Sequence, residues 1–302
     1  MCIRDRDPRV LPAITLTADD FALGSRRLGA VDVRMQRVEG GLEATSITAK
    51  ADSFAVSGTG RWIADASEPL GSRTTATATL TSSDVMQTMK RLDFAPGIDS
   101  DQMQVFVDLS WSGGPRADFL DVLDGEVQVQ FGDGQLEEVE PGAGRMFGLM
   151  SIVALPRRLS LDFRDVFSKG FGFDEISGTF RIVDGESYTC DLSLSGPAAD
   201  IGIVGRAGLA NRDYEQTAVV SASVGDTLPI VGAVVAGPQV AAALLIFSQI
   251  FKKPLQEVGQ VYYGIRGSWD GPEVESTNAA DFARHSELAG CVSVVEQETR
   301  AQ

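Results

Sequence analysis

Apolar and polar residues alternate with a period of two along the first part of the chain. Ile14, Leu16 and Ala18 occupy every second position of one run, and residues 31–35 repeat the pattern. Glycine and acidic residues, as at positions 39–41, separate the runs and are typical of tight turns. The pattern predicts an antiparallel meander with short connections over residues 11–62 and another strand over residues 73–80.

The alternation is strongest near the middle of the chain. Apolar residues occupy every second position from Met103 to Trp111, and residues 125–131 follow with one apolar and one polar side. One-sided alternation is typical of strands with one solvated face, which form antiparallel sheets. Ser82-Ser83-Asp84 predicts the start of a short helix over residues 85–92. Further strands are expected over residues 136–139, 158–163, 176–183, 188–194, 201–204, 215–224 and 260–269.

Two apolar segments interrupt the strand pattern. Residues 143–155 are followed by Pro156 and predict a buried helix. Residues 228–251 have the length of a membrane span, but Gly237-Pro238 divides them into halves that are too short to cross one. We expect an apolar helix pair over residues 228–253 that plugs or caps the sheet, with a membrane-inserted hairpin as the alternative.

These elements predict a mainly β protein with an extended, curled antiparallel sheet, groove-like in shape, and a few helices. Residues 1–116 are expected to form meander repeats with one short helix, and residues 117–272 a second β region that holds both apolar segments. Residues 273–302 are expected to be disordered, because the sequence there is polar and aperiodic. The opening residues show no signal-peptide pattern, and we expect a fragment of a longer protein.

Charge and histidine content argue against most binding and catalytic chemistry. The 302 residues include 26 basic and 42 acidic side chains, a net charge of −16 that repels the phosphates of nucleic acids. The one histidine, His285, lies in the polar C-terminal stretch, so histidine-dependent nucleophiles and metal sites are not expected. Phosphate-binding glycine motifs do not occur either. We therefore predict no enzymatic activity, no cofactor and no metal ion.

Four acidic residues need separate consideration. Asp162, Asp165, Asp174 and Glu175 are close in sequence and could form a calcium site or paired catalytic carboxylates. Asp162 alternates with apolar neighbours on a predicted strand, and arginines lie nearby. A solvated, salt-bridged face is the favoured interpretation, and a metal-dependent hydrolase is the enzymatic alternative.

The cysteines Cys2, Cys190 and Cys291 show no metal-binding or redox spacing. Cys190 shares its parity with Leu192 and Leu194, which predicts a buried thiol. We favour this interpretation over a disulfide between Cys190 and Cys291, which is the alternative in an oxidising compartment.

An antiparallel sheet with one continuous apolar face must cover that face. It can close against a second sheet as a filled sandwich, or it can curl into a trough that accepts an apolar ligand. Small residues are abundant and would leave room in such a trough. Periodicity alone permits both arrangements.

Several residues around position 150 resemble a family signature. The elements are Pro141-Gly142, Gly144-Arg145, Leu155-Pro156-Arg157-Arg158, Leu161-Asp162-Phe163 and Gly170-Phe171. In their order and spacing they resemble the C-terminal region of the YhdP-type branch of the AsmA-like proteins, which belong to Gram-negative cell envelopes. The similarity extends from about residue 109 to about residue 272.

The resemblance implies a part in lipid transfer. Members are anchored in the inner membrane by an N-terminal segment that this sequence lacks, and they extend through the periplasm. They are similar to bridge-like lipid-transfer proteins, in which a long curled sheet forms an apolar groove. The implied function is movement of phospholipids between the inner and outer membranes, which supports outer-membrane barrier integrity.

The implied partners are phospholipids and an outer-membrane or periplasmic protein. The alternative is a non-enzymatic structural or assembly adaptor in the periplasm with a filled β core. The positions expected to contact lipid are apolar positions of the strands and of the helix pair: Val105, Val107, Leu109, Val127, Val129, Phe131, Leu159, Leu161, Phe163, Leu244, Leu245 and Phe247.

Overall fold

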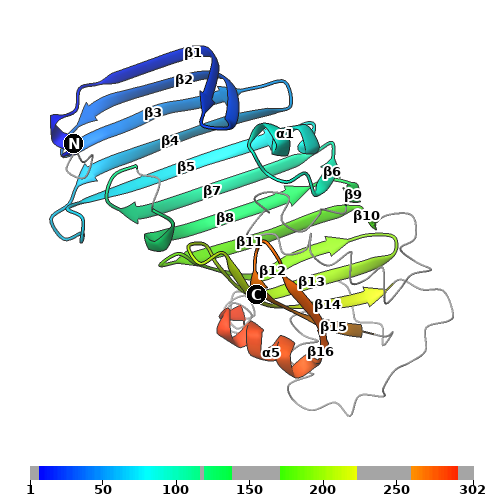
Figure 1. Cartoon of the computed structure of the whole chain (residues 1–302). Helices are drawn as coiled ribbons and strands as arrows, with labels where there is room; N and C mark the ends of the chain where they lie inside the picture. The colour runs from blue at the N-terminus through cyan, green and yellow to red at the C-terminus, as the bar shows by residue number, and fades with distance from the viewer. Residues whose placement is uncertain (1–6, 116–118, 138–170, 223–259, 292–302) are drawn as a thin grey trace, which may run out of the picture.

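A computed structural model of the chain describes residues 7–115, 119–137, 171–222 and 260–291 (Figure 1). Its main feature is a 13-stranded sheet in which neighbouring strands are antiparallel and follow the order of the chain. The strands are β1 (Ile14–Leu23), β2 (Arg26–Val38), β3 (Gly41–Lys50), β4 (Phe54–Ala64), β5 (Ser72–Ser82), β7 (Met103–Ser112), β8 (Leu123–Phe131), β11 (Glu175–Val183), β12 (Glu186–Ser195), β13 (Ala199–Gly208), β14 (Asp213–Ala222), β15 (Gln260–Ser268) and β16 (Glu273–Thr277).

A second sheet has three short strands in the order β10-β9-β6, and it lies beside α1 at one end of the main strands (Figure 1). Its strands are β6 (Ile98–Ser100), β9 (Gly134–Leu136) and β10 (Phe171–Phe173). The described residues also form the helices α1 (Val85–Arg91) and α5 (Ala279–Leu288) and the 3-10 turns η2 (Pro8–Val10) and η3 (Leu120–Val122). As predicted, the Asp84 carboxylate caps α1 by accepting a 2.8 Å hydrogen bond from the Gln87 amide.

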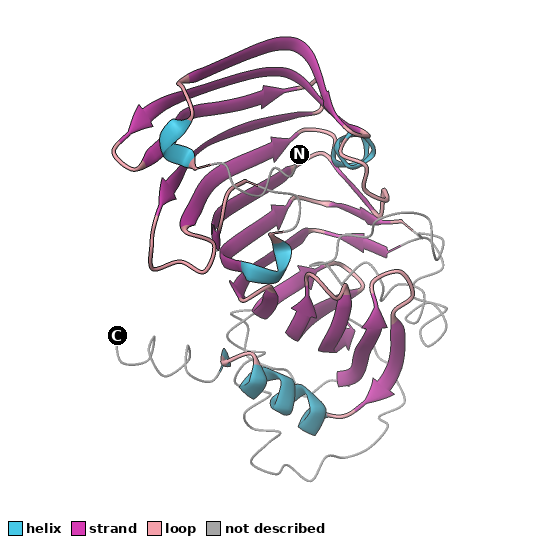
Figure 2. Cartoon of the chain, turned by 60° about the vertical axis from the view of Figure 1, so that its left-hand side comes forward, coloured by secondary structure: helices cyan, strands magenta, loops and turns pink. Residues whose placement is uncertain are grey.

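The main sheet confirms the predicted antiparallel β architecture, and it is not closed. β1 and β16 form its two edges, and the sheet bends between its N-terminal strands and β11–β16 (Figure 2). β7 and β8 pair from Met103↔Phe131 to Trp111↔Leu123, so the sheet continues across the expected boundary near residue 116.

Three sequence expectations fall outside the described residues: the helix over residues 143–155, the strand over residues 158–163 and the helix pair over residues 228–253. Within the ranges that are described, no helix is long and apolar enough to cross a membrane. The expected disorder of residues 273–302 is wrong for the described part, because residues 273–277 form β16 and residues 279–288 form α5. Asn278 starts α5, and its side chain accepts from the amides of Ala280 and Asp281.

The helix α5 covers the polar side of β13–β15 and forms a second small core there. Phe282 is fully buried, and its ring meets that of Tyr262 edge-on at 6.0 Å. Val204 and Val219 belong to the same cluster. These strands are therefore apolar on both sides, and the short unbroken apolar runs at residues 201–204 and 218–220 were the sequence signal for it.

Cys190 and Cys291 form a disulfide, so the prediction of a buried free thiol at Cys190 is wrong. The register of β12 shifts between Thr189 and Leu192 against both neighbouring strands, which marks a β-bulge. An extra residue in a strand moves the side chains that follow it to the opposite side of the sheet from the one that strict alternation predicts. Cys190 therefore lies on the same side as α5, opposite to Leu192.

His285 is part of the folded core, which the polar sequence around it did not indicate. Its side chain is 1% exposed, and a 2.6 Å hydrogen bond joins its Nδ1 to Thr217 Oγ1. Glu215 Oε1 lies 3.7 Å from Nε2. Burial, and secondly the charge of Arg284, lower the pKa of His285 below its usual value.

This shift predicts a loss of stability in mild acid. The unfolded chain takes up the proton near pH 6.5, whereas folded His285 resists it, so the free energy of unfolding falls as the pH decreases below about 6.5. The facing charges are mixed: Arg284 and Arg266 disfavour the proton, and Glu215 and Asp281 favour it. Denaturant unfolding of the wild type and His285→Asn at pH 5 to 8 should show a shallower slope in the variant. Equal slopes would contradict this assignment.

Candidate functional site

One side of the main sheet carries apolar side chains from strand to strand in transverse rows. We call this side the apolar face. The strand register defines a middle row that crosses ten strands, with these members in order from β3 to β15: Ile47, Gly58, Ala78, Val107, Val127, Phe180, Thr189, Gly205, Gln216 and Ile265. Because the side chains of a strand alternate between its two sides, each row continues from one strand to the next.

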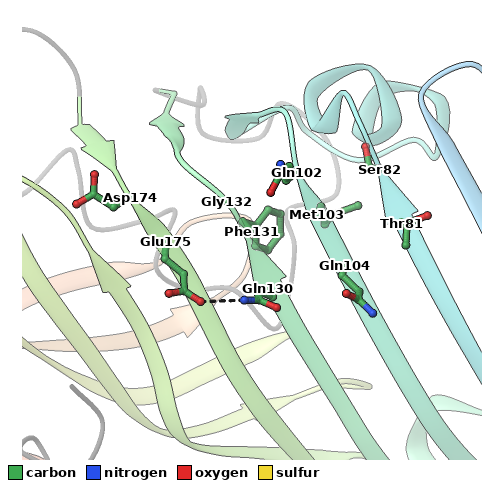
Figure 3. A pocket seen from close by; sticks show the side chains of 10 residues that line it. All are labelled: Thr81, Ser82, Gln102, Met103, Gln104, Gln130, Phe131, Gly132, Asp174 and Glu175. Carbon is green, nitrogen blue, oxygen red and sulfur yellow. Dashed lines mark hydrogen bonds between the residues drawn. The ribbon is translucent and has the colours of Figure 1, made fainter. Parts of the chain in front are cut away.

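The apolar face is uncharged over this whole width. On the described strands from β3 to β15, the residues whose side chains lie on the apolar face include no Asp, Glu, Lys or Arg. The opposite side of the same strands carries threonines, glutamines and charged residues. Figure 3 shows some of them, including Thr81, Gln104 and Gln130. An apolar ligand could therefore move along the rows without meeting a charge.

The exposure of the apolar face changes along the sheet. Ala76, Ala78, Val105, Val107 and Leu109 on β5 and β7 are partly buried and accessible to solvent. From β11 to β15 the corresponding positions are closed: Ile176, Leu192, Ile203, Ala218 and Ile265 are 0% exposed. The face is therefore accessible in its middle rows from β3 to β7 and closed from β11 to β15, while residues nearer the strand ends, such as Leu42 and Phe54, are buried.

The accessible part of the apolar face carries small residues on β4 and β5, so its side chains project little above the backbone. Gly58 and Gly60 on β4 lie opposite Ala78 and Ala76 on β5. A Cβ atom at Gly58 would lie 2.5 Å from the Thr77 carbonyl oxygen and 2.9 Å from the Ala78 Cβ, so a larger residue would displace the neighbouring strand. Glycine at position 58 therefore permits the close approach of β4 and β5. These positions are not among those expected to contact lipid, although the alternation of threonine and alanine over residues 73–80 is a sequence signal for small residues on one side of β5.

Larger groups border the face at both ends of the strands. At one end, α1 and the three-stranded sheet supply Val85, Met89 and Phe173 to the same hydrophobic cluster as Met103 and Phe131. At the other end, Trp62 and Trp111 lie on either side of Thr74.

The tryptophans at this second border are held in place. The Trp111 ring stacks on Phe119 with ring centroids 4.6 Å apart. Hydrogen bonds of 3.0 Å fix both indoles, from Trp62 Nε1 to Ser72 Oγ and from Trp111 Nε1 to the Gly114 carbonyl oxygen. The accessible rows are therefore bordered by packed groups at both ends of the strands.

The structure brings together the six described residues expected to contact lipid. Val105 pairs with Val129 and Val107 with Val127, while Leu109 lies opposite Gly125. Val127 and Val129 are 8% and 9% exposed, and Phe131 is only 1% exposed within the main core. Phe131 is therefore a core residue in this structure. Leu159, Leu161, Phe163, Leu244, Leu245 and Phe247 lie outside the described residues.

A polar hollow of about 400 Å³ opens at the strand ends near α1 (Figure 3). Asp174 and Glu175, two of the four acidic residues considered above, line it, and Gln130 Nε2 donates a 3.0 Å hydrogen bond to Glu175 Oε1. Asp162 and Asp165 fall in an undescribed range. No group of three potential metal ligands occurs in the part of the chain that the structure describes.

The fold and this face together define a protein built on an open antiparallel β-sheet with one uncharged, mostly apolar side. A family model described as "YhdP protein" matches residues 4–274. The chain belongs to this family.

Among curated proteins, the chain is similar to the intermembrane phospholipid transporter YhdP of Escherichia coli strain K12. The two are 34% identical over 178 residues, which make up 59% of this chain and 14% of the transporter. The chain therefore corresponds to a small part of that protein's length. No solved structure matches the chain.

Proposed function

We propose that this chain is a segment of a protein that moves phospholipids between the inner and outer membranes, and that it carries their acyl chains on the apolar face. The observation that supports this most is the continuous, uncharged and partly accessible set of rows from β3 to β8. Each methylene group that leaves water contributes about 0.8 kcal/mol, so burial of acyl chains alone provides affinity. A charged headgroup can remain in water at the open side.

Two further observations support the proposal. The similar protein from Escherichia coli is named as a phospholipid transporter, which agrees with a role in lipid binding. The Cys190–Cys291 disulfide is typical of oxidising compartments such as the periplasm. We infer a periplasmic position for this segment, in a protein held in the inner membrane by another part of its chain.

The position of a bound lipid can be tested with a matched pair of neighbouring residues. Val107 lies on the apolar face, whereas Phe106, which is 36% exposed, lies on the opposite side. A photo-crosslinking amino acid at position 107 should capture phospholipid when the full chain is produced in the periplasm of a Gram-negative host. The same amino acid at position 106 should capture little. Mass spectrometry of the irradiated protein measures both adducts.

The adaptor with a filled β core is the second candidate, because the positions from β11 to β15 are closed. It predicts no adduct at position 107, a lipid-free mass for the purified chain and a stable fold. Equal capture at positions 106 and 107 would indicate nonspecific contact with lipid and would also contradict the proposal.

A further inference from the structure

The apolar face has a positive charge beside it at its N-terminal edge. Arg37 on β2 lies directly opposite Leu42 on β3, which in turn pairs with Trp62 on β4. Residues that pair directly across two antiparallel strands project to the same side of the sheet. Arg37 therefore extends the row of Leu42 and Trp62, and it places a guanidinium group at the border of a surface that is uncharged from β3 to β15.

The Arg37 side chain is available to a ligand. It is exposed, and it forms no ion pair within the described residues. One 2.8 Å hydrogen bond, from its Nη2 to the Arg9 carbonyl oxygen, holds it at the end of β2. A guanidinium group has five N–H donors, so others remain free. By contrast, Arg34 on the opposite side of β2 pairs with Asp32 at 3.1 Å.

The accessible stretch of the apolar face is open at the same edge and closed at the other. The middle row continues from Ile47 through Val33 on β2 to Leu16 on β1, which is 39% exposed. In the other direction it ends at Val127 and Phe180, which are 8% and 1% exposed. A group that must stay in water therefore fits at the edge formed by β1 and β2 (Figure 1), and not at β11.

The length of this stretch matches one acyl chain. β3 and β7 are three inter-strand spacings apart, which corresponds to roughly 14 Å. Two opposed acyl chains fill the hydrocarbon core of a bilayer, about 30 Å thick, so one chain spans about 15 Å. An acyl chain that begins over β3 would therefore end near β7, and its headgroup would lie over β2.

Charge complementarity selects the part of the headgroup that Arg37 contacts. The planar guanidinium group matches two oxygens of a phosphate, whereas it repels an amine. The acidic residues near it do not occupy it: Asp7 is bound by Arg9, and Glu39 in the following turn is exposed and makes no ion pair with Arg37. A phosphate at this border also keeps part of its hydration, so it avoids the cost of burying a charge.

We propose that Arg37 binds the phosphate of a phospholipid whose acyl chains lie across β3 to β7 on the apolar face. The bound lipid then has one orientation, with its headgroup at the β1–β2 edge and its chain ends towards β8. This inference rests on the proposed function, since it requires a lipid on the apolar face. It adds a residue that recognises the headgroup to a surface that elsewhere offers only burial.

The first test compares two lipids that differ only in the phosphate. Native mass spectrometry of the full chain measures the affinities for dioleoyl phosphatidate and dioleoylglycerol. We expect Arg37→Gln to lower the ratio of these affinities about five-fold, the effect of an exposed charge-assisted hydrogen bond. Arg37→Lys keeps the charge and should lower it less. Arg34→Gln, the same change on the opposite side of β2, should leave the ratio as in the wild type.

The outcomes separate this inference from the proposed function. An equal ratio in Arg37→Gln and Arg34→Gln, while position 107 still captures lipid, would overturn the role of Arg37 alone. Binding of neither lipid by the wild type would overturn both proposals. Denaturant unfolding of the lipid-free variants is the second measurement. A clear loss of stability in Arg37→Gln, with equal loss of both lipids, would show that Arg37 only holds the segment of Arg9 in place.

The orientation can be tested without any substitution. Methyl NMR spectra of the full chain are recorded with phospholipids that carry a spin label either near the end of an acyl chain or on the headgroup. The chain-end label should broaden the signals of Val107 more than those of Val33, and the headgroup label should do the reverse. The same pattern with both labels, or the opposite one, would contradict a single orientation with the phosphate at Arg37.

Discussion

Replacement of Val107 by glutamate is expected to reduce phospholipid binding by roughly 100-fold. Val107 lies in the middle of the accessible rows, between Ala78 and Val127. An acyl chain that covers this position would force the new carboxylate out of water, which costs about 3 kcal/mol or more. Lipid extraction from the purified chain, followed by quantification per protein molecule, measures the effect.

The control for this variant is Phe106→Glu. It introduces the same charge at the neighbouring residue but on the opposite side of the sheet, where Phe106 is already 36% exposed. We expect this variant to retain its lipid. Loss of lipid in both variants would indicate a general effect of charge or folding. Retention in both would show that the apolar face is not the binding surface.

Removal of the disulfide is expected to produce the largest loss of stability. Cys190 and Cys291 are 101 residues apart in sequence. A crosslink over a loop of this length stabilises the folded state by about 4–5 kcal/mol in the chain-entropy model, and losses of 2–5 kcal/mol are typical. We expect the double substitution of Cys190 and Cys291 by serine to lower the free energy of unfolding by this amount in a denaturant titration.

The loss should be concentrated at α5 and leave the apolar face intact. The helix packs through Phe282 on the side of the sheet opposite to Val107. Amide hydrogen exchange of residues 279–288 should therefore accelerate in the double variant, while its lipid content stays unchanged. Cys2→Ser is the control and should behave as the wild type. A double variant with unchanged stability would show that the packing of α5 alone holds it on the sheet.

The accessible part of the candidate site could be recognised largely from the sequence. Strict alternation from Met103 to Trp111 and over residues 125–131 placed Val105, Val107, Val127 and Val129 on one side of two neighbouring strands, which the register confirms. Alternation is a local property of the backbone, and it survives folding wherever a strand is regular. The same reasoning could not show that Phe131 is enclosed, because its neighbours α1 and β10 come from distant segments.

Gln216 illustrates a second limit. In the sequence it is one polar residue in a strand with mixed composition, and nothing local distinguishes it from the exposed glutamines Gln104 and Gln128. Only the pairing of Gly205 with Gln216 and the burial of Gln216 show that this side chain lies within the packed part of the apolar face.

The sequence by itself determined the antiparallel order of the strands, the side of most residues within each strand and the uncharged character of the apolar face. These follow from a period of two and from short turns, which are encoded locally. The tertiary structure decided which parts of that face are accessible and where α5 packs. It also decided which cysteines form a disulfide. A β-bulge that follows Thr189 places Cys190 on the side of the sheet that α5 covers. There it bonds to Cys291, which is 101 residues away in the sequence. Such long-range contacts depend on the relative positions of many strands, and a local sequence pattern does not encode these positions.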